Sequence, residues 1–166
     1  AAVLALALLF VVTLHSESNA GTYSISETLS GLEEVPPNVS PASRVLIANY
    51  DDVTNTLIFT VSWQNFMAGT TAGHFHGPAP IGVNAGVQIG FVGLPLAVTS
   101  GSYSNTFVLT AAQETQLLSG LWYVNIHSSA FPGGEIRSQL NPVVPTGNFF
   151  GINETLSGLE EVPPNA

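Results

Sequence analysis

The sequence contains no cysteine among its 166 residues. Disulfide bonds, thiolate metal sites and cysteine nucleophiles are therefore excluded. Any bound metal ion would have to be held by histidine, carboxylate, amide or backbone oxygen ligands.

Cationic side chains are almost absent, with 2 Lys+Arg against 11 Asp+Glu and a net charge of −9. Nucleic-acid binding needs several Lys or Arg side chains that neutralise phosphates. Electrostatic binding to anionic lipid also needs a basic cluster. We therefore expect no nucleic acid and no electrostatically bound membrane among the partners.

Recognisable catalytic motifs are also missing. The sequence has no Gly-x-Ser-x-Gly elbow and no glycine-rich loop with phosphate-binding spacing. We expect no enzymatic activity and no resident organic cofactor.

Hydrophobic residues make up 45% of the chain, and 16 Gly with 11 Pro separate the apolar runs. This pattern predicts an all-β domain with many turns. Thr110 followed by Gln113 is typical of a helix capping box. One short helix is expected at 111–118, and eight strands at 22–32, 43–50, 56–63, 71–76, 86–91, 101–109, 121–127 and 135–140. Such short strands favour a Greek-key sandwich or barrel.

The N-terminal residues 1–20 resemble a secretory signal. Residues 1–14 are uncharged and almost wholly apolar, and Ser18 and Ala20 form a small-x-small pattern. The apolar run is shorter than the roughly 20 residues of a membrane span. The alternative is a hydrophobic N-terminal segment that is kept as an anchor or an assembly element. Either interpretation predicts a secreted, extracellular or cell-surface protein.

Twelve residues occur twice without change, because 27–38 (ETLSGLEEVPPN) recurs as 154–165. The simplest interpretation is a complete domain over 21–144, followed by a linker and the first strand of a repeated unit over 145–166. In the alternative, the second copy is a donor strand that completes a neighbouring subunit. Other copies of the chain or neighbouring repeats are then the partners. The strand-exchange residues would be Glu154, Leu156, Leu159 and Val162.

The acidic, proline-containing stretch Glu33–Pro37 follows the first strand. Paired prolines cannot join a β-ladder. We expect an extended loop with solvated carboxylates.

Three of the four histidines lie in two strand-like runs. His74 and His76 share one face of their strand, and Asn125 and His127 share one face of theirs. Two imidazoles at this spacing can chelate copper or zinc, and His127 can add a third nitrogen. Asn125 or Glu135 would orient a ring by a hydrogen bond to the imidazole nitrogen that does not bind the metal.

A structural polar cluster is the competing interpretation. Glu135 and Arg137 are two residues apart and would share a face, so a local ion pair is possible. Histidines close to such a pair would then complete a hydrogen-bonded network and bind no metal.

Three segments, 72–79 (AGHFHGPA), 120–127 (GLWYVNIH) and 132–140 (PGGEIRSQL), occur in an order and spacing that resemble the CHRD domain, named after chordin. The LSGxxEVPP stretch also resembles the family's first strand, and the resemblance covers about 21–140. It implies an extracellular, immunoglobulin-like β-sandwich module, often repeated, without an agreed enzymatic activity.

The leading functional hypothesis is a secreted, non-enzymatic β-sandwich module of a tandem or polymeric extracellular protein. It would act in adhesion, matrix or filament building, with β-strand addition as one route. The alternative is a copper- or zinc-binding or redox module that uses the histidine cluster.

Overall fold

The computed structural model describes residues 21–143. The predicted signal-like segment and the second copy of the repeat lie outside the described residues. The elements are β1 (Thr22–Ser30), the 3-10 helix η1 (Gly31–Glu33), β2 (Ser43–Asp51), β3 (Thr56–Trp63), β4 (Thr70–His76), β5 (Val87–Gly90), β6 (Gly101–Val108), α1 (Ala111–Leu118), β7 (Tyr123–Ser128) and β8 (Ile136–Gln139). The prediction of an all-β chain with eight strands and one short helix is confirmed.

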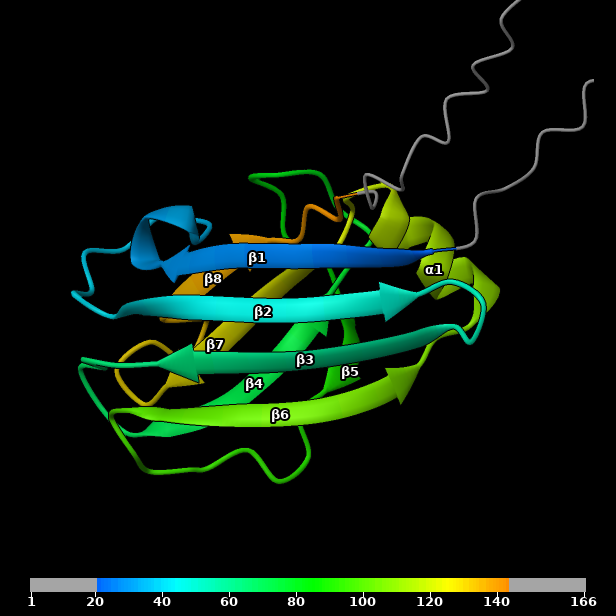
Figure 1. Ribbon diagram of the computed structural model, residues 1–166. Helices are drawn as coiled ribbons and strands as arrows, with labels where there is room; N and C mark the ends of the chain where they lie inside the picture. The colour runs from blue at the N-terminus through cyan, green and yellow to red at the C-terminus, as the bar shows by residue number, and fades with distance from the viewer. Residues whose placement is uncertain (1–20, 144–166) are drawn as a thin grey trace, which may run out of the picture.

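All eight strands belong to one antiparallel sheet in the order β5-β4-β7-β8-β1-β2-β3-β6. Ser30 and Arg137 form the only residue pair that joins β1 to β8 within the described chain. The sheet curls at this narrow junction into a half-barrel. β1, β2, β3 and β6 then lie in front of β8, β7, β4 and β5 (Figure 1). The expected immunoglobulin-like Greek-key sandwich is not confirmed, because hydrogen bonds continue from one layer into the other.

The hydrophobic core fills the space between the two layers. Strand alternation buries Leu57, Phe59 and Val61 of β3 on the inner face. The Phe59 ring centroid lies 4.8 Å from that of Phe75 on β4, so the front and rear layers are in direct aromatic contact. An aromatic pair of this kind contributes about 0.5–1.5 kcal/mol beyond its burial.

The rear layer carries a polar array on its outer side. Phe75 faces the core, so its neighbours on β4 face outward. Asn125 of β7 pairs with His74 of β4 on one side and with Arg137 of β8 on the other. We call this outer array the polar face; its side chains are His74, His76, Tyr123, Asn125, His127 and Arg137. Four of these side chains are buried: His76, Tyr123, Asn125 and Arg137.

The α-helix α1 begins as the sequence predicts. The Thr110 side chain accepts from the Gln113 backbone N–H, and the Gln113 side chain accepts from the Thr110 backbone N–H. This reciprocal capping satisfies two backbone donors that the first helical turn leaves free. Within residues 21–143, no helix has the length and apolar character needed to cross a membrane.

Candidate metal centre

Three histidines from two adjacent strands meet on the polar face. His74 and His76 lie on β4, and the β4–β7 register pairs His127 with Ala72. His127 is therefore diagonal to His74. One ligand nitrogen from each of the three rings lies within 4.8 Å of those of the other two. The three ligands predicted from the sequence are thus brought together by the strand pairing.

Backbone carbonyls orient two of the three rings. His76 Nδ1 lies 3.0 Å from the Ala85 carbonyl oxygen, and His127 Nδ1 lies 2.9 Å from the Pro132 carbonyl oxygen. A carbonyl oxygen only accepts hydrogen bonds, so both Nδ1 atoms must carry the proton. In each neutral ring the Nε2 atom is left with a free lone pair. Metal-binding histidines are oriented in the same way in many proteins.

His74 completes the group from the other side. Its Nδ1 lies 3.1 Å from His127 Nε2, to which it donates a hydrogen bond because that nitrogen has no proton. His76 Nε2 is buried and has no hydrogen-bond partner among the described residues. An unpartnered buried acceptor is uncommon in a folded protein and calls for an explanation. A bound cation at the centre of the three rings would provide one.

Burial keeps the three imidazoles neutral. The pKa of His74 is lowered to about 4, mainly by desolvation and also by charge repulsion from the neighbouring His127 and His76. Desolvation also lowers the pKa of His76 and of His127, partly offset by their bonds to Ala85 and Pro132. Neutral imidazole is the form that binds metal, so the rings are ready to bind at neutral pH.

The donor set fits a borderline transition metal. Three neutral imidazoles suit zinc or copper, whereas calcium and magnesium prefer several oxygen ligands. Metal–nitrogen bonds of about 2.0–2.1 Å place ligating nitrogens within about 4.2 Å of one another. The His74–His127 spacing of 3.1 Å already satisfies this limit. The largest spacing in the group is at most 4.8 Å, so the rings would move closer together around a bound ion.

Tyr123 and Arg137 form one wall of the site. The Tyr123 ring stacks on His76 with centroids 4.8 Å apart and an interplanar angle of 3°. The Arg137 guanidinium carbon lies 3.4 Å from the centre of the same tyrosine ring. These contacts fix the His76 ring in addition to its bond to Ala85.

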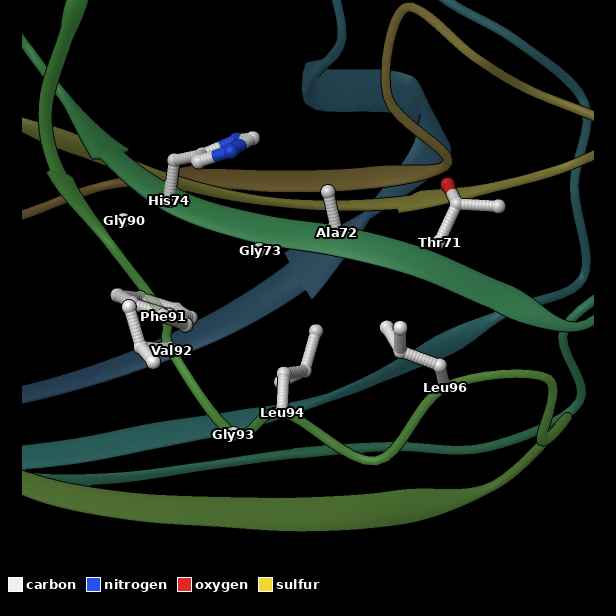
Figure 2. Close-up of a pocket in the computed structure, with 10 residues that line it drawn as sticks. All are labelled: Thr71, Ala72, Gly73, His74, Gly90, Phe91, Val92, Gly93, Leu94 and Leu96. Carbon is white, nitrogen blue, oxygen red and sulfur yellow. The ribbon is translucent and has the colours of Figure 1, made fainter.

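An apolar cavity of about 280 Å³ lies beside β4 and is lined in part by Phe91, Leu94 and Leu96. Figure 2 shows these side chains on one side of the strand and the His74 ring on the other. His74 is also among the residues that line the cavity, so the imidazole cluster borders it.

The two residues predicted to orient the histidine rings, Asn125 and Glu135, have other partners. Asn125 Nδ2 donates to Glu34 Oε2 across 3.3 Å. Glu135 Oε1 accepts from the Ser40 hydroxyl at 2.6 Å and from the Met67 backbone N–H at 2.7 Å. Within the described chain, the hydrogen bonds that orient histidine rings come from backbone carbonyls and not from these two side chains.

The cationic member of the predicted polar cluster is also bonded elsewhere. Arg137 donates to the Val83 carbonyl at 2.8 Å and to Asn84 Oδ1 at 2.9 Å. Its charge acts on Glu34, whose pKa it lowers against a larger opposing effect of burial. Among residues 21–143, the carboxylates whose charges act on Arg137 are therefore Glu34 and Glu33. Glu135 instead bonds to Ser40 and Met67.

Three participants were not predicted from the sequence. The Ala85 and Pro132 carbonyls have no side-chain signature, so no motif indicates them. Glu34 was expected in a solvated loop, but it is only 5% exposed. This expectation was wrong because Glu34 packs against Asn125, which is 91 positions away in the chain. The EVPP stretch that begins with Glu34 has the sequence of an ordinary loop. Only the three-dimensional fold explains why the Glu34 side chain is buried.

Comparison with known proteins supplies one match. No curated protein and no solved structure matches the chain. The model of the CHRD domain matches residues 25–140, which include the whole polar face. CHRD domains are extracellular-type β modules and are generally found in extracellular proteins. The chain belongs to the CHRD domain family.

Proposed function

We propose that the chain is a secreted, non-enzymatic β module that binds one copper or zinc ion through His74, His76 and His127. The observation that carries the proposal is the convergence of two carbonyl-oriented imidazoles on a third. The Nε2 lone pairs of His76 and His127 both face the site. The lone pair of His127 accepts from His74 Nδ1, and that of His76 is buried without a partner in the described chain.

Each protein group has a defined part in this proposal. The ion would act as a Lewis acid that accepts the imidazole lone pairs facing it. The Ala85 and Pro132 carbonyls hold the His76 and His127 rings in the tautomer that exposes Nε2. His74 moves its proton from Nδ1 to Nε2 if Nδ1 is the ligand. Ligands on both β4 and β7 would also tie these strands together.

Copper(II) is the favoured ion in this proposal. Affinity for a given nitrogen site rises toward copper(II) and is lower for zinc. The cluster contributes three nitrogens and no protein carboxylate, which leaves coordination positions to water or another ligand. A direct test is equilibrium dialysis of the metal-free chain against each ion. One equivalent of copper, bound more tightly than zinc, supports the proposal, whereas no stoichiometric binding of either ion contradicts it.

A second candidate function is assembly within a tandem or polymeric extracellular protein, in adhesion, matrix or filament building. The observation that favours it is the place of the repeated segment in the fold. β1 lies between β2 and β8, and its Leu29 is fully buried. An identical second copy can form the same contacts, either in the next unit of an array or in a neighbouring molecule by strand exchange.

We expect Leu156→Asp to abolish assembly of the full chain if the second copy fills a β1 position in another molecule. Leu156 corresponds to Leu29, and a carboxylate at such a buried position is strongly unfavourable. Sedimentation velocity at high protein concentration measures the effect, with Thr155→Ser as the control on the same segment, because the corresponding Thr28 is exposed. Monomeric behaviour of the unaltered chain at every concentration would rule out exchange between molecules.

A further inference from the structure

A buried acidic side chain lies outside the histidine cluster, in the segment that the chain repeats. We call residues 31–40 the strap, because they cross the edge of the polar face after β1. Asn38 Nδ2 donates to the carbonyls of Gly134 and Glu135, at 3.3 and 3.2 Å. The Val35 carbonyl accepts from Asn84 Nδ2 at 2.9 Å. The strap is thereby fastened to two different loops.

Three buried oxygens near the strap have no partner in the described chain, and one of them, Glu135 Oε2, is on a carboxyl group whose other oxygen accepts from Ser40. The remaining two lie beneath the strap. They are Glu34 Oε1 and Asn125 Oδ1. The other oxygen of Glu34 already accepts from Asn125 Nδ2 at 3.3 Å. Gly134 is packed against both groups, since a Cβ atom at this position would collide with Glu34 Oε1 and with Asn125 Oδ1. Both unpaired oxygens are therefore next to the same point of the backbone.

Two oxygens without hydrogen cannot bond to each other, but one added proton satisfies both. We propose that Glu34 is protonated in the closed state and donates from Oε1 to Asn125 Oδ1, so that a carboxyl–amide pair with two hydrogen bonds latches the strap onto the polar face. The proton comes from solvent and returns to solvent when the latch opens. An ionised Glu34 would leave both oxygens as acceptors facing each other in a buried site.

The electrostatics of the site support this assignment. Burial raises the pKa of Glu34 to about 7, although the Arg137 charge and bonds to Val35 and Asn125 act in the opposite direction. The other charged groups near the strap are Glu33, on the strap itself, and Glu135, which is bonded to Ser40. Neither neutralises an ionised Glu34, and Arg137 only partly does.

The direction of the pH effect follows from linkage. The folded-state pKa of Glu34 is raised from 4.5 to about 7, so the folded state binds the proton more tightly than the unfolded state. The stabilisation is complete below pH of about 4.5 and declines as the pH rises through 7. The latch is thus closed in mildly acidic surroundings and weakened in alkaline ones.

The strap also contacts the supports of the histidine cluster. Asn84, which bonds to the strap, precedes Ala85, whose carbonyl orients His76. Gly134, which bonds to Asn38, is in the same loop as Pro132, whose carbonyl orients His127. Release of the strap therefore loosens both supports. The latch does not depend on a bound metal, and it is tested in metal-free protein.

The test compares the metal-free chain with Glu34→Gln and Glu33→Gln, by chemical unfolding at pH 5 and pH 8. Glutamine is a permanent mimic of the protonated acid. We expect Glu34→Gln to lower the unfolding constant roughly 100-fold at pH 8 and only a few-fold at pH 5. Glu33→Gln should not reproduce this pH-dependent difference. A Glu34→Gln effect that is equal at both pH values, or a destabilisation at pH 8, overturns the proposal.

An infrared measurement addresses the proton itself. At pH 5.5 the carbonyl stretch of a buried protonated carboxyl group should be present in the unaltered chain and in Glu33→Gln, and absent in Glu34→Gln. The same band in all three proteins, or in none, contradicts a proton on Glu34. Neither experiment uses metal, so failure of the latch is distinguishable from failure of the metal proposal.

Discussion

Replacement of both His74 and His76 by alanine is expected to abolish stoichiometric copper or zinc binding. The double variant removes two of three converging nitrogens and leaves His127 as a single imidazole. Loss of even one group that orients a metal ligand lowers affinity about 10- to 100-fold. We therefore expect a loss of at least 100-fold for two ligands, measured by competition with a chelator of known affinity.

The fourth histidine supplies the matched control for this variant. His15→Ala, made in the full chain that keeps residues 1–20, removes an imidazole that belongs to neither β4 nor β7, and it should leave stoichiometry and affinity unchanged. Thermal unfolding of the metal-free double variant shows whether the fold survives. Retention of one tightly bound ion by a folded double variant would place the metal elsewhere.

Gly134→Ala is expected to destabilise the fold by about 2–4 kcal/mol. The Gly134 φ angle of 133° is rarely adopted by residues with a side chain. The new methyl group would also push Glu34 away from Asn125, which separates two buried polar groups. The estimate combines overpacking with the loss of a buried hydrogen bond.

The adjacent glycine provides the control for Gly134→Ala. A Cβ atom on Gly133 meets nothing within 4 Å, so Gly133→Ala should change the free energy of unfolding by less than about 0.5 kcal/mol. Both variants are compared by equilibrium denaturation. Equal effects of the two substitutions would mean that the tight packing beneath the strap contributes little to stability.

The strands could be predicted from the sequence because local signals agree. Glycine, proline and asparagine bound each apolar run, and the Thr110–Gln113 pair marks the helix start. The common direction of His74 and His76 follows from the two-residue period of a strand. These features depend on neighbours in the chain, so no long-range contact is needed to recognise them.

The arrangement of the layers depends on one long-range contact. Ser30 pairs with Arg137 and makes the two layers parts of one sheet. A single pair of residues more than 100 positions apart has no local pattern. Spacing alone could therefore predict antiparallel strands in two layers, but it could not distinguish a sandwich from a curled sheet.

The surroundings of the histidines were unpredictable for a related reason. Glu135 lies just before β8 and turns toward Ser40, so the two-residue period does not place it beside Arg137. The Ala85 and Pro132 contacts come from backbone oxygens, which every residue has. Sequence patterns therefore identified the imidazoles but not the groups that determine their tautomers.

The most direct test of the central claim is electron paramagnetic resonance of the chain loaded with one equivalent of copper(II). We predict a single copper species whose spectrum shows three imidazole nitrogens, and a loss of this species in the His74→Ala/His76→Ala variant. A heterogeneous signal from weakly bound copper, or an unchanged three-nitrogen spectrum in the folded double variant, would contradict a metal centre formed by His74, His76 and His127.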